Sequence, residues 1–353
     1  MPRAKKVVVS KIASDAEILG QKGEYFDASH YHTIITSNCD VYKAENGELL
    51  CKFRKKMIPV NLCKTAMNSF RKASKKKSST RGAAAGILDR NKIAGYVADF
   101  VNPGKVSTKF LSSQTGKLSG QSVTNLSQSN IVGYYDKRDR NPGFTNIGNP
   151  PCRLTSFSRD EVEKWEASLP FIRKIDECFF KLVPNLHKAQ QIAASRIPEF
   201  QIMDTAFSTL TINYSWRSAM HKDAGDYKAG FGTLVVCEDE ENPHTYEGCY
   251  LGFPQFGICV DLRQGDFLAM DVHEWHCNTE FYPTNSEFTQ EYADNVTKYQ
   301  NQWHFNRLSV VSYFREGMSK CIQDDDNDDN NNDNNDNKND INNDNKKRQK
   351  VKR

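Results

Sequence analysis

The chain has 353 residues, of which 26% are charged and 38% are hydrophobic, and its mean hydropathy is −0.70. This length and apolar content suffice for one large or two small folded domains, and they exclude a collagen-like or wholly disordered protein. No apolar run approaches the ~20 residues that a membrane helix needs, and the first residues lead into no signal-peptide core. We therefore expect a soluble, intracellular protein that makes no membrane contact. The ten cysteines are dispersed without a Cys-x-x-Cys pair, which predicts buried reduced thiols.

The net charge of +4 hides an uneven distribution. Residues 1–90 hold 18 Lys and Arg against 8 Asp and Glu, residues 324–345 hold nine Asp and one Lys, and residues 346–353 hold six Lys and Arg. The Asp/Asn run has too little apolar surface to offset its chain entropy, so we expect residues 324–353 to be a disordered tail, acidic and then basic. Its basic end predicts nuclear import if the protein is eukaryotic; the alternative is a solvated tail that balances the acidic run.

Residues 1–90 are expected to form a basic N-terminal region with some secondary structure. The alternation of apolar and basic positions from Leu49 to Phe70 is compatible with a strand followed by a helix. The basic cluster Arg71–Lys77 precedes the flexible stretch Gly82–Gly86. This arrangement suits contacts with phosphate groups, although many such runs are only solvated helix faces.

A helical pattern follows farther along the chain. Ser158 and Glu161 form a capping-box pattern, and apolar residues recur behind them at helical spacing up to about Ala194. Pro170 and Pro184 interrupt this pattern, so we expect one or two helices that pack their apolar stripe against a core.

After Ile202 the chain changes to short runs of β-branched and aromatic residues. Turn signals separate these runs at the spacing of an all-β sandwich or barrel, and no helix lies between them, which disfavours a parallel α/β sheet. We therefore expect an α+β protein with flanking helices and strands at residues 207–214, 232–237, 249–253, 257–262, 267–271 and 308–314.

One tripeptide combines an imidazole and a carboxylate at a spacing that suits a metal ion. In His221-Lys222-Asp223, residues i and i+2 of an extended segment point to the same face. With a second histidine from a distant strand they would form a facial triad, which suits Fe(II) because it leaves positions open for a co-substrate and dioxygen. By itself the tripeptide is a weak signal.

The order of motifs after this tripeptide strengthens the hypothesis. Gly265-Asp266 opens an apolar run, His276 lies eleven residues after Gly265, and Arg307-Leu308-Ser309 opens the last apolar run. This order resembles the double-stranded β-helix, or jelly roll, of the Fe(II)/2-oxoglutarate dioxygenases.

The resemblance implies a role for each matching residue. His221, Asp223 and His276 would bind Fe(II). Arg307 and Ser309 would bind the distal carboxylate of 2-oxoglutarate, the arginine through a forked, charge-assisted contact.

Two of these assignments have alternatives. His273 also lies near the third ligand position; we prefer His276 because the family spacing from the Gly-Asp turn fits it, and His273 would then hold a ligand's orientation. The offset of 31 positions from His276 to Arg307 exceeds the usual family gap and implies an inserted lobe at about residues 282–303. Arg315 is the alternative to Arg307.

The resemblance narrows to the TET/JBP branch of these enzymes. It is strong across residues 202–316 and weaker upstream, so we expect a dioxygenase domain at residues 91–323 with its jelly-roll core at about 202–316. The motifs that carry it are Trp216-Arg217-Ser218-Ala219, Gly225-Asp226-Tyr227, Gly230-Phe231-Gly232 and the run from Phe267 to Asn278, with Arg81–Gly86 and Pro151–Thr155 upstream.

Enzymes of this branch oxidise the 5-methyl group of thymine or 5-methylcytosine in nucleic acid. The resemblance therefore implies a dioxygenase with Fe(II) and 2-oxoglutarate as cofactors, which hydroxylates this methyl group and has DNA as its partner. Tyr227 and Phe231 are candidates to stack on the base, although they fit core packing equally well. Since the block charges leave −4 for residues 91–323, the basic N-terminal block or the tail would supply the phosphate contacts.

Three other interpretations remain open at this stage. The protein could be an oxygenase acting on a protein side chain or a small molecule, because the whole superfamily shares the metal site. It could also be a non-catalytic module that binds modified nucleic acid, or a cupin-type metabolite-binding protein. The sequence predicts no oligomeric state.

Overall fold

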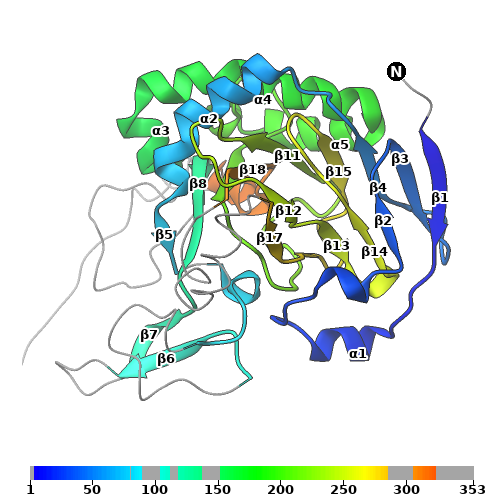
Figure 1. Ribbon diagram of the computed structural model, residues 1–353. Coiled ribbons are helices and arrows are strands. Elements are labelled where there is room, and N and C mark those ends of the chain that lie inside the picture. The colour runs from blue at the N-terminus through cyan, green and yellow to red at the C-terminus, as the bar shows by residue number, and fades with distance from the viewer. Residues whose placement is uncertain are drawn as a thin grey trace, which may run out of the picture.

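The computed structural model describes residues 4–79, 81–89, 104–111, 118–136, 152–284 and 305–322. These residues form three layers (Figure 1): helices cover the outer face of a large sheet, and a smaller sheet packs against its inner face. The expected α+β class with flanking helices agrees with this arrangement. The predicted tail at residues 324–353 and most of the predicted lobe at 282–303 lie outside the described residues.

The large sheet has ten strands, and β11 and β18 lie near its middle. Neighbouring strands are antiparallel except for the parallel pair β1 and β3. In order across the sheet the strands are β1 (Lys5–Val9), β3 (Cys39–Lys43), β4 (Leu49–Arg54), β15 (Phe267–Met270), β11 (Gly232–Glu238), β18 (Arg307–Tyr313), β10 (Thr209–Tyr214), β8 (Ser127–Tyr135) and β5 (Lys77–Ser78), with β9 (Arg153–Leu154) also paired to β8.

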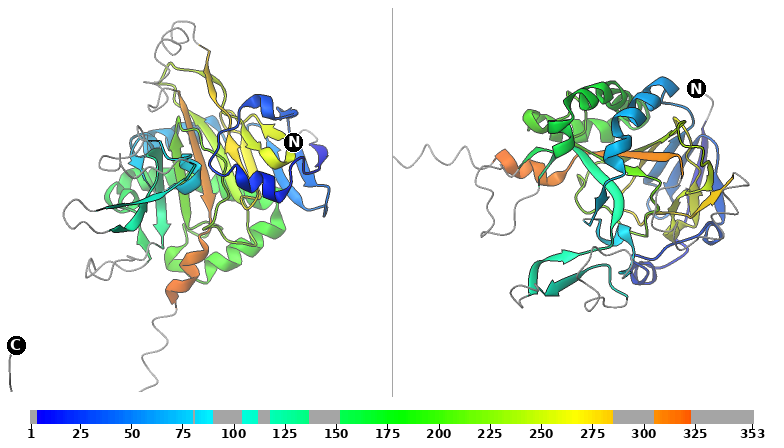
Figure 2. Two further views of the ribbon diagram at one scale, coloured as in Figure 1. Left: turned by 90° about the horizontal axis from the view of Figure 1, so that it is seen from below. Right: turned by 60° about the vertical axis from the view of Figure 1, so that its left-hand side comes forward.

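The smaller sheet has four strands and faces the large one. Its order is β16 (Cys277–Asn278), β13 (Leu251–Phe253), β14 (Ile258–Val260) and β2 (Thr33–Ile35), with β2 parallel to β14. Two further strand pairs lie outside both sheets: β12 (Tyr246–Gly248) with β17 (Phe281–Pro283), and β6 (Thr108–Leu111) with β7 (Leu118–Val123). Figure 2 shows β6 and β7 projecting from the body.

Each face of the large sheet has its own apolar core. Between the two sheets, Phe53, Val236 and Leu268 of the large sheet pack with Phe253 and Val260 of the small one. The outer core joins the large sheet to α2 (Val60–Ser74) and α4 (Val162–Leu182). The remaining helices are α1 (Asp15–Gly20), α3 (Ser156–Asp160) and α5 (Pro184–Ser195), with short 3₁₀ segments η1 (Ala28–His30), η2 (Gly82–Ala85), η4 (Pro198–Phe200), η5 (Pro254–Phe256) and η6 (Glu316–Ile322).

The turn before β15 explains the predicted Gly-Asp signal. Gly265 has a φ of +73°, and a Cβ atom there would lie 2.6 Å from the carbonyl oxygen of Ile58, so only glycine fits. Both carboxylate oxygens of the buried Asp266 accept main-chain N–H groups, from Lys56 and Arg263. The motif therefore closes a turn and does not contribute chemistry.

The sheet crosses the domain boundary expected near residue 90. Strands β1, β3 and β4 belong to the N-terminal block, yet they extend the same sheet as β15, and α2 packs on that sheet. The described residues of this N-terminal block are thus part of the same folded unit as the jelly-roll strands. Pairing between segments more than 200 residues apart leaves no local signal in the sequence.

Three local predictions need correction. Thr155 caps α3 through its side chain, whereas Ser158 hydrogen-bonds the amide of Gly133 and caps no helix. Pro170 lies inside α4 without ending it, although Pro184 does begin α5. Eight cysteines are free and buried as predicted, but Cys152 is disulfide-bonded. In the described ranges, no helix combines the length and the apolar composition that crossing a bilayer requires.

Candidate metal centre

The main chain brings into contact two segments that lie far apart in the sequence. His221 lies in the loop after β10, and His276 lies just before β16. Each donates its amide to the carbonyl oxygen of the other at 3.0 Å, which makes an isolated antiparallel bridge. The amide of Asp223 also donates to the carbonyl oxygen of Val272 at 3.0 Å. Three main-chain hydrogen bonds thus fix the positions of these three residues before their side chains interact.

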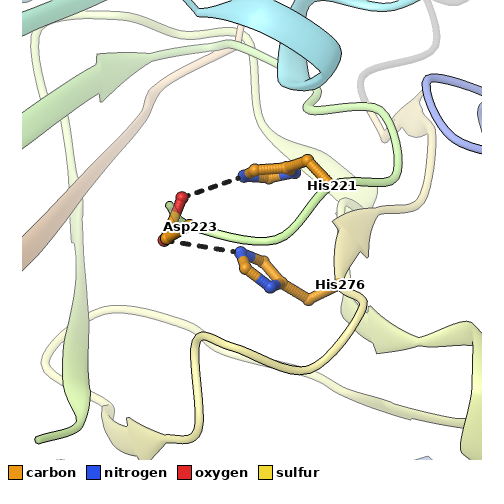
Figure 3. A group of neighbouring side chains, drawn as sticks. All are labelled: His221, Asp223 and His276. Carbon is orange, nitrogen blue, oxygen red and sulfur yellow. Dashed lines mark ion pairs between the residues drawn. The ribbon is translucent and has the colours of Figure 1, made fainter. Parts of the chain in front are cut away.

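The three side chains point toward one another (Figure 3). Nε2 of His221 lies 3.5 Å from Oδ1 of Asp223, and Nε2 of His276 lies 3.7 Å from Oδ2 of the same carboxylate. The two imidazole centroids are 4.3 Å apart. One donor atom from each residue lies within 4.8 Å of the others. This is the spacing at which three ligands can share one ion.

Hydrogen bonds on the far side of each ring fix its tautomer. Nδ1 of His221 lies 2.8 Å from the carbonyl oxygen of Ala219, and Nδ1 of His276 lies 2.9 Å from that of Glu274. Because a carbonyl oxygen can only accept, Nδ1 must carry the proton in both rings. Each Nε2 therefore directs a lone pair toward the carboxylate, as a metal-binding imidazole requires.

The electrostatics favour the same protonation state. Burial, helped by the neighbouring His221, lowers the pKa of His276 to about 4. Burial acts to raise the pKa of Asp223, but its contacts with His221 and His276 and the charge of Arg81 outweigh it and lower that pKa to about 2. Near neutral pH the pair is a neutral imidazole and an ionised carboxylate, the forms that bind metal. Two imidazoles and one carboxylate suit Fe(II), so the donor set fits the ion that the sequence predicts.

His273 lies apart from this cluster. Its Nε2 is 3.3 Å from the carbonyl oxygen of Tyr227, and its amide donates to Oδ1 of Asp271. The geometry therefore favours His276 over His273 as the third ligand.

Arg307, at the start of β18, is a buried cation with free hydrogen-bonding capacity. Its exposed fraction is 2%, and neither Nε nor Nη2 has a hydrogen-bond partner among the described residues. Ser309 lies two residues on, also buried, and its hydroxyl accepts a hydrogen bond from Asn213 at 3.3 Å. A buried guanidinium with two unused donors is costly unless an anion binds it, so the site fits the carboxylate of a co-substrate.

Arg315, the alternative arginine, already has a partner. Its Nε and Nη2 both lie 2.6 Å from Oδ1 of Asp136. The difference favours Arg307 as the residue that binds an external carboxylate.

The two candidate stacking residues lie in packed surroundings. Phe231 is buried in the core between the large sheet and the helices. Tyr227 is half-buried and meets Phe314 edge to face, with ring centroids 5.9 Å apart. Phe231 is thus a core residue, while the role of Tyr227 toward a base stays a prediction.

Sequence reasoning missed several charged residues around the cluster. The charge of Arg81 acts on Asp223, and the buried Asp226 forms an isolated strand bridge with Arg315. Burial and the neighbouring Asp223 raise the pKa of Asp226 well above its ordinary value, and its Oδ2 has no described partner. Arg81 and Asp226 lie in motifs on which the family resemblance rests, but the presence of a residue in a motif does not by itself indicate its role.

Comparison with known proteins agrees with this geometry. Residues 130–316 match the Tet_JBP family model, described as the oxygenase domain of the 2OGFeDO superfamily. The match covers more than half of the chain, and the chain therefore belongs to this family. Membership confirms the predicted TET/JBP resemblance and supports the predicted jelly-roll core.

Individual relatives carry more specific names. The bifunctional helicase and thymine dioxygenase JBP2 of Leishmania major is 34% identical over 193 residues, which cover 54% of this chain and 15% of that protein. Thymine dioxygenase JBP1-B of Trypanosoma cruzi is 29% identical over 247 residues, 68% of this chain and 25% of that protein. This chain therefore spans only a quarter or less of these relatives. The solved structure of NgTET1 in complex with 5mC DNA is similar with a TM-score of 0.43 and 12% identity, covering 87% of this chain and 93% of that chain.

Proposed function

We propose that this protein is an Fe(II)- and 2-oxoglutarate-dependent dioxygenase that hydroxylates the 5-methyl group of thymine or 5-methylcytosine in DNA. Thymine is the first base to test, because the curated relatives are named thymine dioxygenases. The observation that carries the proposal is the convergence of His221, Asp223 and His276, in a chain where Nε and Nη2 of the buried Arg307 also lack a hydrogen-bond partner among the described residues.

The residues of the chain would hold the cofactors in the following way. The Nε2 atoms of His221 and His276 and one carboxylate oxygen of Asp223 would bind Fe(II) on one side and leave the other open. The free donors of Arg307, with the hydroxyl of Ser309, would bind the distal carboxylate of 2-oxoglutarate. When bound, the iron and 2-oxoglutarate supply oxygen activation coupled to decarboxylation of the co-substrate to succinate. The protein contributes orientation and exclusion of water.

Reaching the methyl group requires the target base to leave the duplex. Base flipping costs a few kcal/mol, which contacts with the DNA backbone must offset. Arg71 of the basic cluster is paired with Asp239 and Glu241, so it is already engaged within the protein. Lys72, Lys76 and Lys77 are exposed and are the members of the cluster that we assign to phosphate contacts. The expected nuclear location rests on the tail alone and stays a prediction.

The test is mass spectrometry of nucleosides released from duplexes after incubation with the protein. One duplex contains thymine without 5-methylcytosine, and the other carries 5-methylcytosine with uracil in place of thymine. We expect an added oxygen on the methyl group of at least one base, dependent on both Fe(II) and 2-oxoglutarate. Succinate formation without any oxidised base would place the substrate outside DNA, and the absence of both products would overturn the enzyme assignment.

A further inference from the structure

A buried lysine from the N-terminal block contacts the turn that leads to His276. Lys43 ends β3, and its side chain is only 8% exposed. Its Nζ lies 3.2 Å from Oδ2 of Asp271 and 3.0 Å from Oε1 of Glu274. Glu48, across the β3–β4 turn, adds a third carboxylate at 3.2 Å, but its side chain is 65% exposed. Lys43 is therefore held mainly by the two carboxylates of the turn.

That turn positions two of the three candidate ligands. The main-chain carbonyl of Glu274 accepts Nδ1 of His276, and the carbonyl of Val272 accepts the amide of Asp223. The amide of Asp271 donates to the carbonyl oxygen of Leu50, which ties the start of the turn to β4. Any movement of residues 271–274 would therefore displace the acceptor that orients the His276 ring.

Glu274 also reaches the segment that carries the other two ligands. Its Oε2 lies 4.0 Å from Nζ of Lys222, the residue between His221 and Asp223. Lys222 in turn lies over the ring of Trp275 at 5.1 Å. Through Glu274, the position of Lys43 is thus coupled to both ligand-bearing segments.

We propose that Lys43 is a positioning residue for the metal centre, which holds the Asp271–Glu274 turn in the conformation that directs His276 at the metal. The inference rests on the proposed function, because it assumes that the cluster binds Fe(II). It assigns a role to a residue outside the part of the chain that matches the family model, residues 130–316.

The physical reason is that the positive charge of Lys43 balances two negative charges in a region that water reaches poorly. The carboxylates of Asp271 and Glu274 are 17% and 16% exposed and contact the same nitrogen atom, so they lie close together. Without the ammonium they would repel each other with little screening by water. The turn would then open, and the carbonyl of Glu274 would move away from His276. Losing a group that hydrogen-bonds a metal ligand commonly weakens metal binding by about 10- to 100-fold, and displacement of the Glu274 carbonyl would remove such a group from His276.

The experiment measures Fe(II) affinity of the full chain under anaerobic conditions, by competition with a chelator. We expect the Kd for Fe(II) to rise by about 10- to 100-fold in Lys43→Met, which keeps the length of the side chain but loses its charge. Lys43→Arg should restore most of the affinity. The matched control is Lys174→Met, which breaks the exposed ion pair with Glu177 on α4 and should leave the Kd unchanged.

A second variant keeps the inference testable if Lys43→Met does not fold. Glu274→Gln retains the carbonyl group but removes the charge that meets Lys43 and Lys222, so it should also weaken Fe(II) binding, with Glu177→Gln as its control. An unchanged Kd in either folded variant would overturn the inference and leave the proposed function standing. A wild-type chain that binds no Fe(II) would overturn both.

Discussion

Charged groups in the candidate site, which comprises His221, Asp223, His276 and Arg307, and charged groups along α2 are satisfied in opposite ways. Along α2, Arg71 pairs its Nη2 with Oδ1 of Asp239 at 2.7 Å, and Oδ2 of the same carboxylate accepts the hydroxyl of Tyr214 at 2.7 Å. In the candidate site, the two Nε2 lone pairs face the carboxylate of Asp223, and Arg307 forms no ion pair with a described carboxylate.

This difference distinguishes charged residues that stabilise the fold from charged residues that can bind a ligand. Native proteins satisfy nearly all buried polar groups. Arg71 is paired with two carboxylates, and only its Nε lacks a described partner, so its charge is balanced within the protein. The acceptor atoms of His221, Asp223 and His276 converge without a cation between them, and Arg307 is a buried cation without a carboxylate partner among the described residues. A cation bound by the first group and an anion bound by Arg307 would compensate these unpaired groups. The α2 network should therefore affect stability alone, while the candidate site should control binding.

The largest effect is expected from removing the anionic ligand. Asp223→Ala should abolish Fe(II) binding and reduce turnover to background, because the two remaining imidazoles carry no charge to balance the ion. Metal content after anaerobic reconstitution and succinate formation measure the two losses. His273→Ala is the control and should keep its iron. Iron retained in His276→Ala and lost in His273→Ala would transfer the ligand role to His273.

A smaller, selective effect is expected at Arg307. Arg307→Ala should raise the 2-oxoglutarate concentration needed for half-maximal turnover by about 100-fold, since hydrogen bonds to a charged group contribute about 1.5–3 kcal/mol each. The DNA concentration required should change little. Arg315→Ala serves as the comparison, because its guanidinium is already paired with Asp136. If Arg315→Ala raised the 2-oxoglutarate requirement and Arg307→Ala did not, the arginine assignment would be reversed.

The sequence predicted the parts of the molecule whose signals are local. The six predicted strands correspond to β10, β11, β13, β14, β15 and β18, because a short run of β-branched and aromatic residues bounded by turn residues marks each of them. His221 and Asp223 could be paired because their spacing of two defines a shared face in an extended segment. The choice of His276 needed the family resemblance, since spacing alone also allowed His273.

The features that the sequence could not predict depend on distant contacts. Lys43 has no neighbour in sequence that suggests a partner at Glu274, more than 200 residues away. The cap at Thr155 was missed because Ser158 is an equally good capping residue, and only the position of the Gly133 amide decides between them. The lack of a described partner for Nε and Nη2 of Arg307 depends on the positions of the side chains around it, and the sequence does not specify these positions.

The smallest functional effect is expected at Arg71. Arg71→Met leaves Asp239, which is buried, with the hydroxyl of Tyr214 but no cation, so the free energy of unfolding should fall by about 1–3 kcal/mol. Glu241→Ala removes the other partner of Arg71, but that side chain is 72% exposed, and the expected loss is below about 1 kcal/mol. Urea unfolding of the metal-free chain measures both changes.

The Kd for Fe(II) and the requirement for 2-oxoglutarate should stay at wild-type values in both Arg71→Met and Glu241→Ala, because neither residue contacts a candidate ligand. The comparison between the two regions depends on this separation. A weaker Fe(II) affinity in folded Arg71→Met would mean that the α2 network also positions the metal centre. In that case the pairing of charged groups within the protein would no longer distinguish a structural region from a binding region.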